Sequence, residues 1–556
     1  MPVPVIVVNL GHSVLKSLDD YTDAASEIYS HYRKGQNVVA VMSAQRDATD
    51  SLMAEARAVG PEGIARNLPE LVHLGERRSA ALLALALERI GAPAFVRQAR
   101  DLGLKAKGPS TEAELVGMNV KQLQEDLKNH DIIVMPGYVG IGEKDRPVLL
   151  GNGGADMTAI YVAQQLGVKA LLLKDVDGVY EHDPRGSGPA PKRYTQISWE
   201  DAIERAAPLV ASKAIEYAED NELEFDIGTI GVPIYTTVGS HTSKPKAGPV
   251  IKPMRVAMLG CGVVGGGVLR RVGSMPERFS MVKIMVRNID KYIAEGIDPE
   301  LLTADFDDVL AAEPDIFIDV SGPIDPGLEF CRQMLSRGVH IVSANKQAIA
   351  SGGQELIDYA AQQNTQLMFS SAAGGGMPVL EMCLREKGRI TRVEALLNGT
   401  TNYMLGEISK GVPYADALKA AQDKGFAEAD PSGDVNGSDA AAKIRLVALL
   451  GFGKTIDVAD IPRETIDNFA PNEPSKGAFK RVATCWQDKN GFSANLEVKN
   501  LSNNNFLAQA DGEEAHAIFT FDDGDAYKIR GKGAGRWPTT ESVIADLMDI
   551  SSKGIG

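Results

Sequence analysis

Short apolar runs rich in β-branched residues alternate with longer amphipathic stretches along the first part of the chain. The runs VPVIVV, NVVAVMSA, DIIVMPG, ALLLKD and VPIYTTV predict strands that begin at residues 3, 37, 131, 170 and 232. Residues 80–90 and the whole of 111–130 have the spacing of amphipathic helices. Such alternation is typical of an α/β domain built on a parallel sheet.

A stretch rich in Gly, Pro, Lys and Ser, GSHTSKPKAGPVIKP, interrupts this alternation at residues 239–253. Its composition predicts a linker. Strand, glycine turn and helix then recur through MRVAML, GCGVVGGGV, PDIFIDVSG and VHIVSANK. After residue 388 the sheet-like runs RVEALLN and ANLEVKNL mix with an Ala-rich helix, and the last segment has a glycine turn and a helix that begins near Pro538.

Composition and charge narrow the class of protein. A chain of 556 residues is long enough for three or four domains, and 44% hydrophobic and 24% charged residues are ordinary for a globular chain. The net charge of −16 argues against general binding of nucleic acid or of an anionic membrane. Four scattered cysteines without a CxxC pair indicate neither a disulfide framework nor a zinc ribbon. Because the start lacks a basic n-region and no run has the length of a membrane span, we expect a cytoplasmic protein.

The segment LGCGVVG follows a predicted strand and precedes a helical run, which is the context of a dinucleotide-binding turn. The first glycine of such a GxGxxG motif allows the tight turn, the second lets a pyrophosphate approach the backbone, and the third lets the helix pack on the strand. The helix N-terminus adds N–H donors and a positive dipole. The predicted cofactor contacts in this turn are Gly260, Cys261, Gly262, Val263, Val264 and Gly265.

The next predicted strand, MVKIMV, ends at Arg287. A NAD site favours an acidic residue here, which binds the ribose hydroxyls, whereas an arginine suits the 2′-phosphate of NADP. The sequence therefore favours NADP over NAD. Ser321 and Lys346 follow two further predicted strands, at the carboxyl edge where such sheets bind ligands, and we include both among the expected cofactor contacts.

From about residue 254 onward the chain resembles homoserine dehydrogenase. The matching motifs are GCGVVGGGV, SANKQAIA, SSAAGGGMPVLE, LNGTTNYML, GFAEADPSGDVNGSDAAAK and GKGAGRWPT, in the order of the family. The resemblance implies reversible reduction of a small molecule, aspartate 4-semialdehyde, to homoserine with NADPH or NADH. It also implies a homodimer or homotetramer.

The motif that ends in Lys443 carries the candidate chemistry. Asp439 and Lys443 are i and i+4, and are therefore neighbours on one helix face. A partly desolvated lysine beside a carboxylate stays charged and can still transfer a proton. Hydride arriving at an aldehyde carbon creates an alkoxide, which needs a proton or a cation. We predict that Lys443 is the general acid and that Asp439 orients it, although the spacing alone also fits an exposed helix pair.

The resemblance assigns further roles. Lys346 corresponds to a lysine between nicotinamide and substrate, which either competes with Lys443 as the proton donor or holds the substrate carboxylate with its charge. Glu428 resembles the residue that holds the substrate ammonium, Asp434 supports the same loop, and Thr400 donates a hydroxyl to the substrate. Gly533 is expected to approach the cofactor from the closing segment.

The family also binds a sodium-like monovalent cation near the motif AAGGGMP. The carbonyl groups of Ala373, Gly375 and Met377 would be its ligands here. The family commonly has a glutamate three residues before the first of them, where this chain has Ser370. Carbonyl oxygens alone can still hold a hard cation.

The part of the chain before the linker resembles the catalytic domain of aspartate kinase, which has the amino-acid kinase fold. The matching motifs are SAQRDATDSL, HLGERRSA, GYVGIGEKDRPVLLGNGGADMTA and the nucleotide-binding segment KDVDGVYEHDPR. The glycines of GNGGAD would bring N–H groups to phosphates, with Asp156 close by. Glu76 matches a glutamate that positions the substrate.

The first kinase motif fails. Where the family has KFGGTS, this chain reads NLGHSVL, so Asn9 stands in place of the lysine that contacts phosphate. Phosphoryl transfer relies on cations to neutralise the moving phosphoryl group. We therefore predict an inactive or weakened kinase, with ATP binding left open. The regulatory ACT domains that usually follow the kinase in bifunctional enzymes have no room in this linker.

The expected fold is α/β throughout: an amino-acid kinase fold, then a Rossmann domain with an inserted α+β catalytic and dimerisation domain. The predicted divisions are 1–242 (kinase-like), 243–253 (linker), 254–388 (Rossmann), 389–525 (catalytic) and 526–556 (a segment that returns to the Rossmann domain). The leading hypothesis is homoserine dehydrogenase activity. The alternatives are a working kinase–dehydrogenase and a ligand-binding regulator without turnover.

Overall fold

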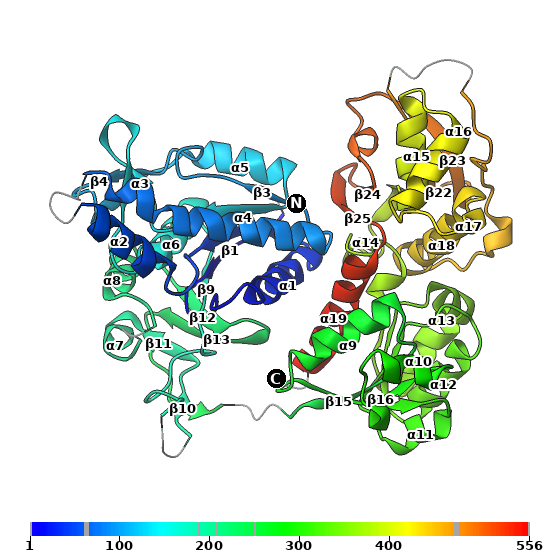
Figure 1. Cartoon of the computed structure of the whole chain (residues 1–556), viewed down its shortest axis with the longest axis horizontal. Helices are drawn as coiled ribbons and strands as arrows, with labels where there is room; N and C mark the ends of the chain where they lie inside the picture. Colours follow the sequence, from blue (N-terminus) through cyan, green and yellow to red (C-terminus); the bar gives the residue numbers. More distant parts are fainter. Residues whose placement is uncertain are drawn as a thin grey trace. The chain divides into compact units, whose positions relative to one another are not determined.

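The computed structural model describes residues 3–60, 66–186, 190–206, 209–248, 252–471 and 477–553. The chain divides into two compact units (Figure 1). Unit 1 comprises residues 1–89 and 93–250, and unit 2 comprises residues 90–92 and 251–556.

Unit 1 is built on an eight-stranded sheet in the order β11-β13-β12-β9-β1-β2-β6-β3. Its central strands pair in parallel and are buried along most of their length, which explains their continuous apolar sequences. The strands of this sheet are β1 (Val5–Leu10), β2 (Asn37–Met42), β3 (Ala94–Val96), β6 (Ile132–Pro136), β9 (Ala170–Leu173), β11 (Gln196–Ser198), β12 (Phe225–Thr229) and β13 (Val232–Gly239). The strand predictions of the first part of the chain are confirmed.

The helices of unit 1 are α1 (Asp20–Arg33), α2 (Ala48–Val59), α3 (Leu68–Val72), α4 (Leu74–Arg89), α5 (Val120–Asn129), α6 (Gly154–Leu166), α7 (Trp199–Arg205) and α8 (Ser212–Asp220). The predicted helix over residues 111–130 is wrong in its first half. There, β5 (Glu114–Gly117) joins the small sheet β5-β4-β7-β8 with β4 (Lys105–Lys107), β7 (Val139–Ile141) and β8 (Pro147–Leu149). Helix α5 begins only after Asn119, whose side chain accepts from the amide of Gln122.

The predicted linker is not entirely irregular. Strand β14 (Lys246–Ala247) pairs antiparallel with β10 (Lys192–Arg193). Residues 249–251 of the predicted linker lie outside the described residues.

Unit 2 contains a six-stranded parallel sheet in the order β17-β16-β15-β18-β19-β20. Its strands are β15 (Met254–Leu259), β16 (Phe279–Met285), β17 (Leu302–Thr303), β18 (Ile316–Asp319), β19 (His340–Ser343) and β20 (Leu367–Met368). Counted along the chain the order is third, second, first, fourth, fifth, sixth, which is the Rossmann arrangement. The order reverses between β15 and β18, where such folds bind ligands.

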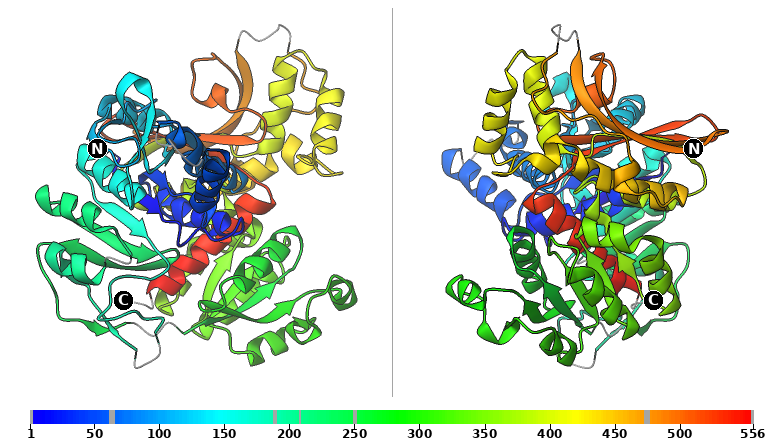
Figure 2. Two further views of the ribbon diagram at one scale, coloured as in Figure 1. Left: turned by 60° about the vertical axis from the view of Figure 1, so that its left-hand side comes forward. Right: turned by 90° about the vertical axis from the view of Figure 1, so that its right-hand side faces the viewer.

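A second sheet of unit 2 is antiparallel, in the order β23-β22-β21-β24-β25. Its strands are β21 (Ile390–Ala395), β22 (Ala478–Asp488), β23 (Gly491–Leu501), β24 (Glu514–Phe521) and β25 (Ala526–Lys532). Helix α15 packs on β22, and α16 packs on α15 (Figure 2, right, yellow helices against orange strands).

The helices of unit 2 are α9 (Val263–Gly273), α10 (Ile289–Ala294), α11 (Phe306–Ala311), α12 (Gly327–Ser336), α13 (Lys346–Gln362), α14 (Val379–Arg385), α15 (Gly399–Ser409), α16 (Tyr414–Asp423), α17 (Ser432–Val435), α18 (Ser438–Phe452) and α19 (Arg536–Lys553). Helix α19 returns from the antiparallel sheet to lie against α9 (Figure 1). The approach is close, because a Cβ on Gly267 would lie 2.4 Å from Oγ1 of Thr540.

No helix in the described part of the chain is both long enough and apolar enough to span a membrane. All four cysteines are buried and free.

Candidate active site

The glycine turn between β15 and α9 has the shape that a dinucleotide requires. Gly260 has a φ of +91°, which favours glycine. A Cβ on Gly265 would lie 2.6 Å from the carbonyl oxygen of Gly260, so a larger residue would separate helix from strand. A Cβ on Gly262 would meet nothing within 4 Å, which leaves open space at the helix N-terminus. The residues therefore fit a pyrophosphate at this turn.

Two predicted cofactor residues follow neighbouring strands of the same sheet. Arg287 is exposed shortly after β16, which adjoins β15. Ser321 follows β18 on the other side of β15, and its amide and hydroxyl both donate to Oδ1 of Asp319, at 2.9 and 2.6 Å. Gly533 lies directly after β25, in the connection to α19.

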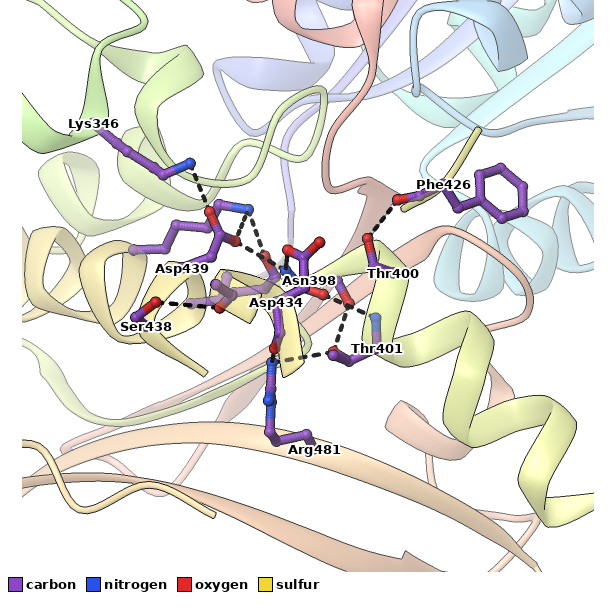
Figure 3. A network of polar contacts seen from close by, with 12 residues as sticks. Lys346, Asn398, Thr400, Thr401, Phe426, Asp434, Ser438, Asp439 and Arg481 are labelled. Atoms are coloured by element: carbon purple, nitrogen blue, oxygen red, sulfur yellow. Dashed lines mark hydrogen bonds and ion pairs between the residues drawn. The ribbon is translucent and has the colours of Figure 1, made fainter. Parts of the chain in front are cut away.

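The Asp439 carboxylate lies between two ammonium groups from different elements (Figure 3). Its Oδ2 is 2.9 Å from Nζ of Lys443, one turn along α18, and its Oδ1 is 2.6 Å from Nζ of Lys346, at the start of α13. Helix α18 belongs to the second sheet's domain, whereas α13 follows β19 of the Rossmann sheet. The structure thus brings together the three predicted catalytic residues.

The two lysines differ in their surroundings. Lys443 is 7% exposed and also donates to the carbonyl oxygen of Leu397 at 2.8 Å. The Lys346 side chain is 34% exposed. Burial alone raises the pKa of the Asp439 carboxyl, but the charges and hydrogen bonds of both lysines outweigh it and hold that pKa well below its usual range. Asp439 is therefore ionised, and the cluster carries one more positive than negative charge when both lysines are protonated.

Asn398 connects this cluster to Asp434. It caps α15 by accepting from the amide of Thr401 at 2.9 Å. Its Nδ2 donates to Oδ1 of Asp434 at 2.5 Å and to Oδ2 of Asp439 at 3.0 Å. One amide therefore fixes the distance between two predicted site carboxylates. The motif LNGTTNYML contains Asn398, and its position before a helix is the signal that could have identified it.

Arg481 holds the main chain of the same loop. Its guanidinium donates to the carbonyl oxygens of Asp434 at 2.5 Å and of Val435 at 2.9 Å, and to Oγ1 of Thr401 at 3.4 Å. The residue is 5% exposed, and burial lowers its pKa to about 10 against the opposing charges of Asp434 and Asp439. Sequence reasoning missed Arg481, because β22 carries no motif and lies far from α17 and α18 in the chain.

Lys346 is positioned by a buried polar group at the edge of the Rossmann sheet. Asn345 caps α13, and its Nδ2 donates to Oδ2 of Asp319 at 3.1 Å and to the carbonyl oxygen of Pro323 at 2.7 Å. Burial raises the pKa of Asp319, against the hydrogen bonds from Ser321 and Asn345. This arrangement fixes the helix start on which Lys346 lies.

Two predicted substrate residues are not part of this network. Glu428 is exposed, and among the described residues its carboxylate has no hydrogen bond or ion pair. The Thr400 hydroxyl donates to the carbonyl oxygen of Phe426 at 2.5 Å. It thereby joins α15 to the segment that carries Glu428.

The predicted cation ligands lie in a buried loop, residues 373–377. Gly374 and Gly375 both have positive φ, and this turns the loop sharply. The carbonyl oxygen of Met377 already accepts from the amide of Val379 at 2.8 Å. Ser370 donates its amide and hydroxyl to Asp546, at 3.0 and 2.7 Å. The described residues contain no group of three or more His, Cys, Asp or Glu side chains placed to hold a metal ion.

Unit 1 has a separate cavity of about 590 Å³. Its lining includes Glu76, Asp156 and Lys174, and Nζ of Lys174 is 2.6 Å from Oδ1 of Asp156. Asn9 does not line it. That side chain is fully buried, with Nδ2 donating to the carbonyl oxygen of Val41 at 3.2 Å.

The fold and the site together define a class. A dinucleotide turn on a Rossmann sheet, next to lysines and a carboxylate able to transfer a proton, is typical of a nicotinamide-dependent oxidoreductase.

Comparisons with known proteins name the family. Sequence profiles of the homoserine dehydrogenase NAD-binding domain and of homoserine dehydrogenase match residues 260–370 and 378–548, and that of the amino acid kinase family matches residues 4–224.

Homoserine dehydrogenase of Synechocystis is 31% identical over 317 residues, which cover 53% of this chain and 73% of that protein. That of Bacillus subtilis is 30% identical over 322 residues, with 54% and 73% covered. The crystal structure of a homoserine dehydrogenase from Thiobacillus denitrificans matches with a TM-score of 0.51 and 31% identity, covering 55% of this chain and 75% of that one. The chain belongs to the homoserine dehydrogenase family, and its first unit is an amino acid kinase domain.

Proposed function

We propose that unit 2 catalyses the reversible reduction of L-aspartate 4-semialdehyde to L-homoserine through the cluster of Lys443, Asp439 and Lys346. The observation that carries the proposal is the single carboxylate held at 2.9 and 2.6 Å by two ammonium groups from two domains. The test is homoserine oxidation by the purified chain with NADP and with NAD. A protein that shows no rate with either cofactor would contradict it.

The nicotinamide, when bound, supplies the hydride that reduces the aldehyde. Lys443 then gives its proton to the developing alkoxide, and it takes the proton back in the oxidation direction. Asp439 orients the Lys443 ammonium, which also donates to the carbonyl oxygen of Leu397. Lys346 is the competing donor, because its side chain is more exposed and its ammonium makes one fewer hydrogen bond among the described residues.

The substrate ammonium requires a carboxylate that is not neutralised by a lysine. Asp434 meets this requirement, since its side chain bonds the neutral amide of Asn398. Glu428 is exposed and its carboxylate has no hydrogen bond or ion pair among the described residues, so it is available to bind the substrate. Thr400 positions that loop through Phe426. We therefore propose Asp434 and Glu428 as substrate-binding residues.

NADP is the proposed cofactor, because the second strand of the Rossmann sheet is followed by the exposed Arg287 and by Asn288 rather than directly by an acidic residue. Replacing Arg287 with Ser should raise the KM for NADP about tenfold and leave the KM for NAD nearly unchanged. Equal effects on both cofactors would remove Arg287 from the 2′-phosphate site.

A monovalent cation on the carbonyl groups of Ala373, Gly375 and Met377 is a further part of the proposal. The glycine-rich turn fits such a ligand set, although Met377 already accepts one hydrogen bond. Initial rates in sodium and in tetramethylammonium salts at equal ionic strength would test it. We also propose a homodimer or homotetramer, which sedimentation analysis would distinguish.

For unit 1 we propose that phosphoryl transfer to aspartate is absent or greatly weakened. Asn9 has a neutral side chain and does not line the cavity, so it does not replace the phosphate-contacting lysine of the family. The rival function is a working kinase, which a hydroxamate assay with ATP and aspartate would reveal. Product formation at a rate comparable to homoserine oxidation would favour the rival.

A further inference from the structure

Two consecutive residues at the start of α15 contact the cluster of Lys443, Asp439 and Lys346. The carbonyl oxygen of Leu397 accepts from Nζ of Lys443 at 2.8 Å. The side chain of Asn398 donates to Oδ2 of Asp439 at 3.0 Å. An ammonium group has three N–H donors, and Lys443 uses one for Leu397 and one for Asp439. The third has no partner among the described residues, so it is the one available to the substrate.

The orientation of the Asn398 amide is fixed by its own helix cap. Its Oδ1 accepts from the main-chain N–H of Thr401 at 2.9 Å, so its Nδ2 faces the other way. The two N–H groups of Nδ2 donate to Oδ1 of Asp434 at 2.5 Å and to Oδ2 of Asp439 at 3.0 Å (Figure 3). Asn398 is only 7% exposed, and its amide uses both donors and its carbonyl oxygen within the protein.

A neutral donor between two carboxylates has an electrostatic role. Asp434 and Asp439 accept from the same nitrogen, so their oxygens are close enough to repel each other when both are ionised. A hydrogen bond to an ionised carboxylate stabilises its charge, and Asn398 donates one to each. Three cations also face this pair of carboxylates from other elements, namely Lys346 of α13, Lys443 of α18 and Arg481 of β22. The amide therefore helps both carboxylates to stay ionised side by side without neutralising either of them.

Helix α15, which carries this amide at its start, is held firmly by buried side chains of β22. The hydroxyl of Thr401 accepts from the guanidinium of Arg481 at 3.4 Å. Asn402 accepts from Nζ of Lys480 at 2.6 Å and donates to the carbonyl oxygen of Gly512 at 3.0 Å. Lys480 and Arg481 are 2% and 5% exposed. These contacts fix α15 on the antiparallel sheet, and they fix the position of the amide with it.

We propose that Asn398 is a positioning residue that couples the binding of the substrate ammonium at Asp434 to proton transfer at Lys443. The amide holds the Asp434 carboxylate in place for the substrate. By donating to Asp439, it also limits the negative charge that acts on the Lys443 ammonium. The proposal rests on the proposed function, because Asp434 and Lys443 have the roles given there. Asn398 acts through the two carboxylates, and not on the reacting atoms.

Homoserine oxidation by the full chain with NADP, measured between about pH 6 and pH 10, tests the proposal. The variant Asn398→Ser keeps a side chain that caps a helix and removes the NH₂ group that reaches both carboxylates. Asn119→Ser is the matched control, because Asn119 caps α5 in unit 1 by accepting from the amide of Gln122 at 3.2 Å. The same substitution is thus made at a helix start that has no part in the cluster.

We expect Asn398→Ser to raise the KM for homoserine at least about fivefold, because a hydrogen bond to the charged Asp434 carboxylate is lost. The KM for NADP should stay unchanged within about twofold. The pH at which kcat reaches half its maximum should move upward, because Asp439 without this donor holds the Lys443 proton more strongly. Asn119→Ser should match the wild type in all three quantities.

The coupling is rejected if Asn398→Ser changes only one of the two quantities, the KM for homoserine or the pH profile, or neither. Equal increases in both KM values with an unmoved pH profile would also reject it, since they indicate a general loosening of α15. A wild type without homoserine oxidation would remove the proposed function and this inference together, whereas an active wild type with an unaffected variant removes the inference alone.

Thermal unfolding shows whether the variants fold. If Asn398→Ser does not fold, Asn398→Gly takes its place, because glycine before the first turn of a helix costs little stability. The same rise in the KM for homoserine and the same upward shift of the pH profile are expected from it. Wild-type kinetics in Asn398→Gly would equally reject the role of Asn398.

Discussion

The two units each hold an aspartate, buried in unit 1 and partly buried in unit 2, in the first turn of a helix that follows a glycine in the left-handed region. In unit 1, Asp156 of α6 follows Gly153 and bonds one lysine, Lys174, at 2.6 Å. In unit 2, Asp439 of α18 follows Gly437 and is shared by two lysines, at 2.9 and 2.6 Å. The first arrangement is a neutral pair, whereas the second has an excess ammonium group. The same local motif therefore forms a one-lysine ion pair in unit 1 and a two-lysine cluster in unit 2, according to the number of cations that other elements bring to it.

The largest expected effect is a fall in kcat when a lysine of the two-lysine cluster in unit 2 is replaced. Lys443→Met should lower kcat for homoserine oxidation about 10²- to 10⁴-fold, because the general acid and base is lost. Lys454→Met, an exposed lysine after the end of the same helix, is the matched control and should leave kcat unchanged. If Lys443→Met keeps the full rate and Lys346→Met has no activity, the proton donor is Lys346 and not Lys443.

The ion pair of Asp156 and Lys174 in unit 1 should contribute to the stability of the fold and not to the rate of homoserine oxidation. Asp156→Asn leaves the Lys174 ammonium, 5% exposed, without its carboxylate, and should destabilise unit 1 by about 3–5 kcal/mol. Homoserine oxidation should remain at the wild-type rate. Urea unfolding followed by circular dichroism gives the first quantity. An unfolding midpoint equal to that of the wild type would show that the pair contributes little.

Arg481 holds the loop next to the two-lysine cluster, and it can be replaced without changing Lys346, Asp439 or Lys443. Arg481→Lys keeps a cation but loses the fork that binds the carbonyls of Asp434 and Val435. We expect kcat/KM for homoserine to fall about tenfold, mainly through KM, because the loop with the substrate carboxylate shifts. Arg463→Lys, which alters an exposed arginine that donates to the carbonyl oxygen of Val458, is the control. A fall in kcat at constant KM would argue against this positioning role.

The smallest expected effect is on the pH dependence of stability, which should differ between the wild type and the variant Asp439→Asn. The pKa of Asp439 is lowered in the folded chain, so its ionised form stabilises the fold above the unfolded value of about 4, and this contribution is lost as the pH falls further. The difference in thermal unfolding temperature between wild type and Asp439→Asn should therefore be full at pH 7 and shrink below about pH 4. A constant difference from pH 7 to pH 3 would mean that the carboxylate charge is not what stabilises the site.

Sequence reasoning reached the strands, the glycine turn and the cluster of Asp439 with both lysines, because each lies within a continuous motif. The spacing of Asp439 and Lys443 placed both on one helix face, but their role and that of Lys346 followed from the resemblance to the family. The mistaken helix over residues 111–130 shows the limit of this approach. An amphipathic spacing continued through Glu114–Gly117, but pairing with β4 decided the conformation.

Sequence reasoning could not predict two other features, the contacts of Arg481 and the ion pair of Asp156 with Lys174, and the reason is different. Arg481 reaches the Asp434 loop from a strand 47 residues away, and its acceptors are main-chain carbonyls, which every residue has. Lys174 stands in a recognised motif, but its ion pair with Asp156 depends on the packing of α6 against β9. Contacts of this kind depend on strand order, and periodicity does not encode strand order.

The return of α19 to α9 has a kinetic consequence. The hydroxyl of Thr540 donates to the carbonyl oxygen of Val264, 276 residues earlier, so the surface of α9 that α19 covers stays exposed until nearly all of unit 2 has been synthesised. Contacts between such distant positions form late, since loop closure must come before any gain from them. The domain that contains the antiparallel sheet is then free to fold first, and the dinucleotide fold is completed afterwards, around a module that already has its structure.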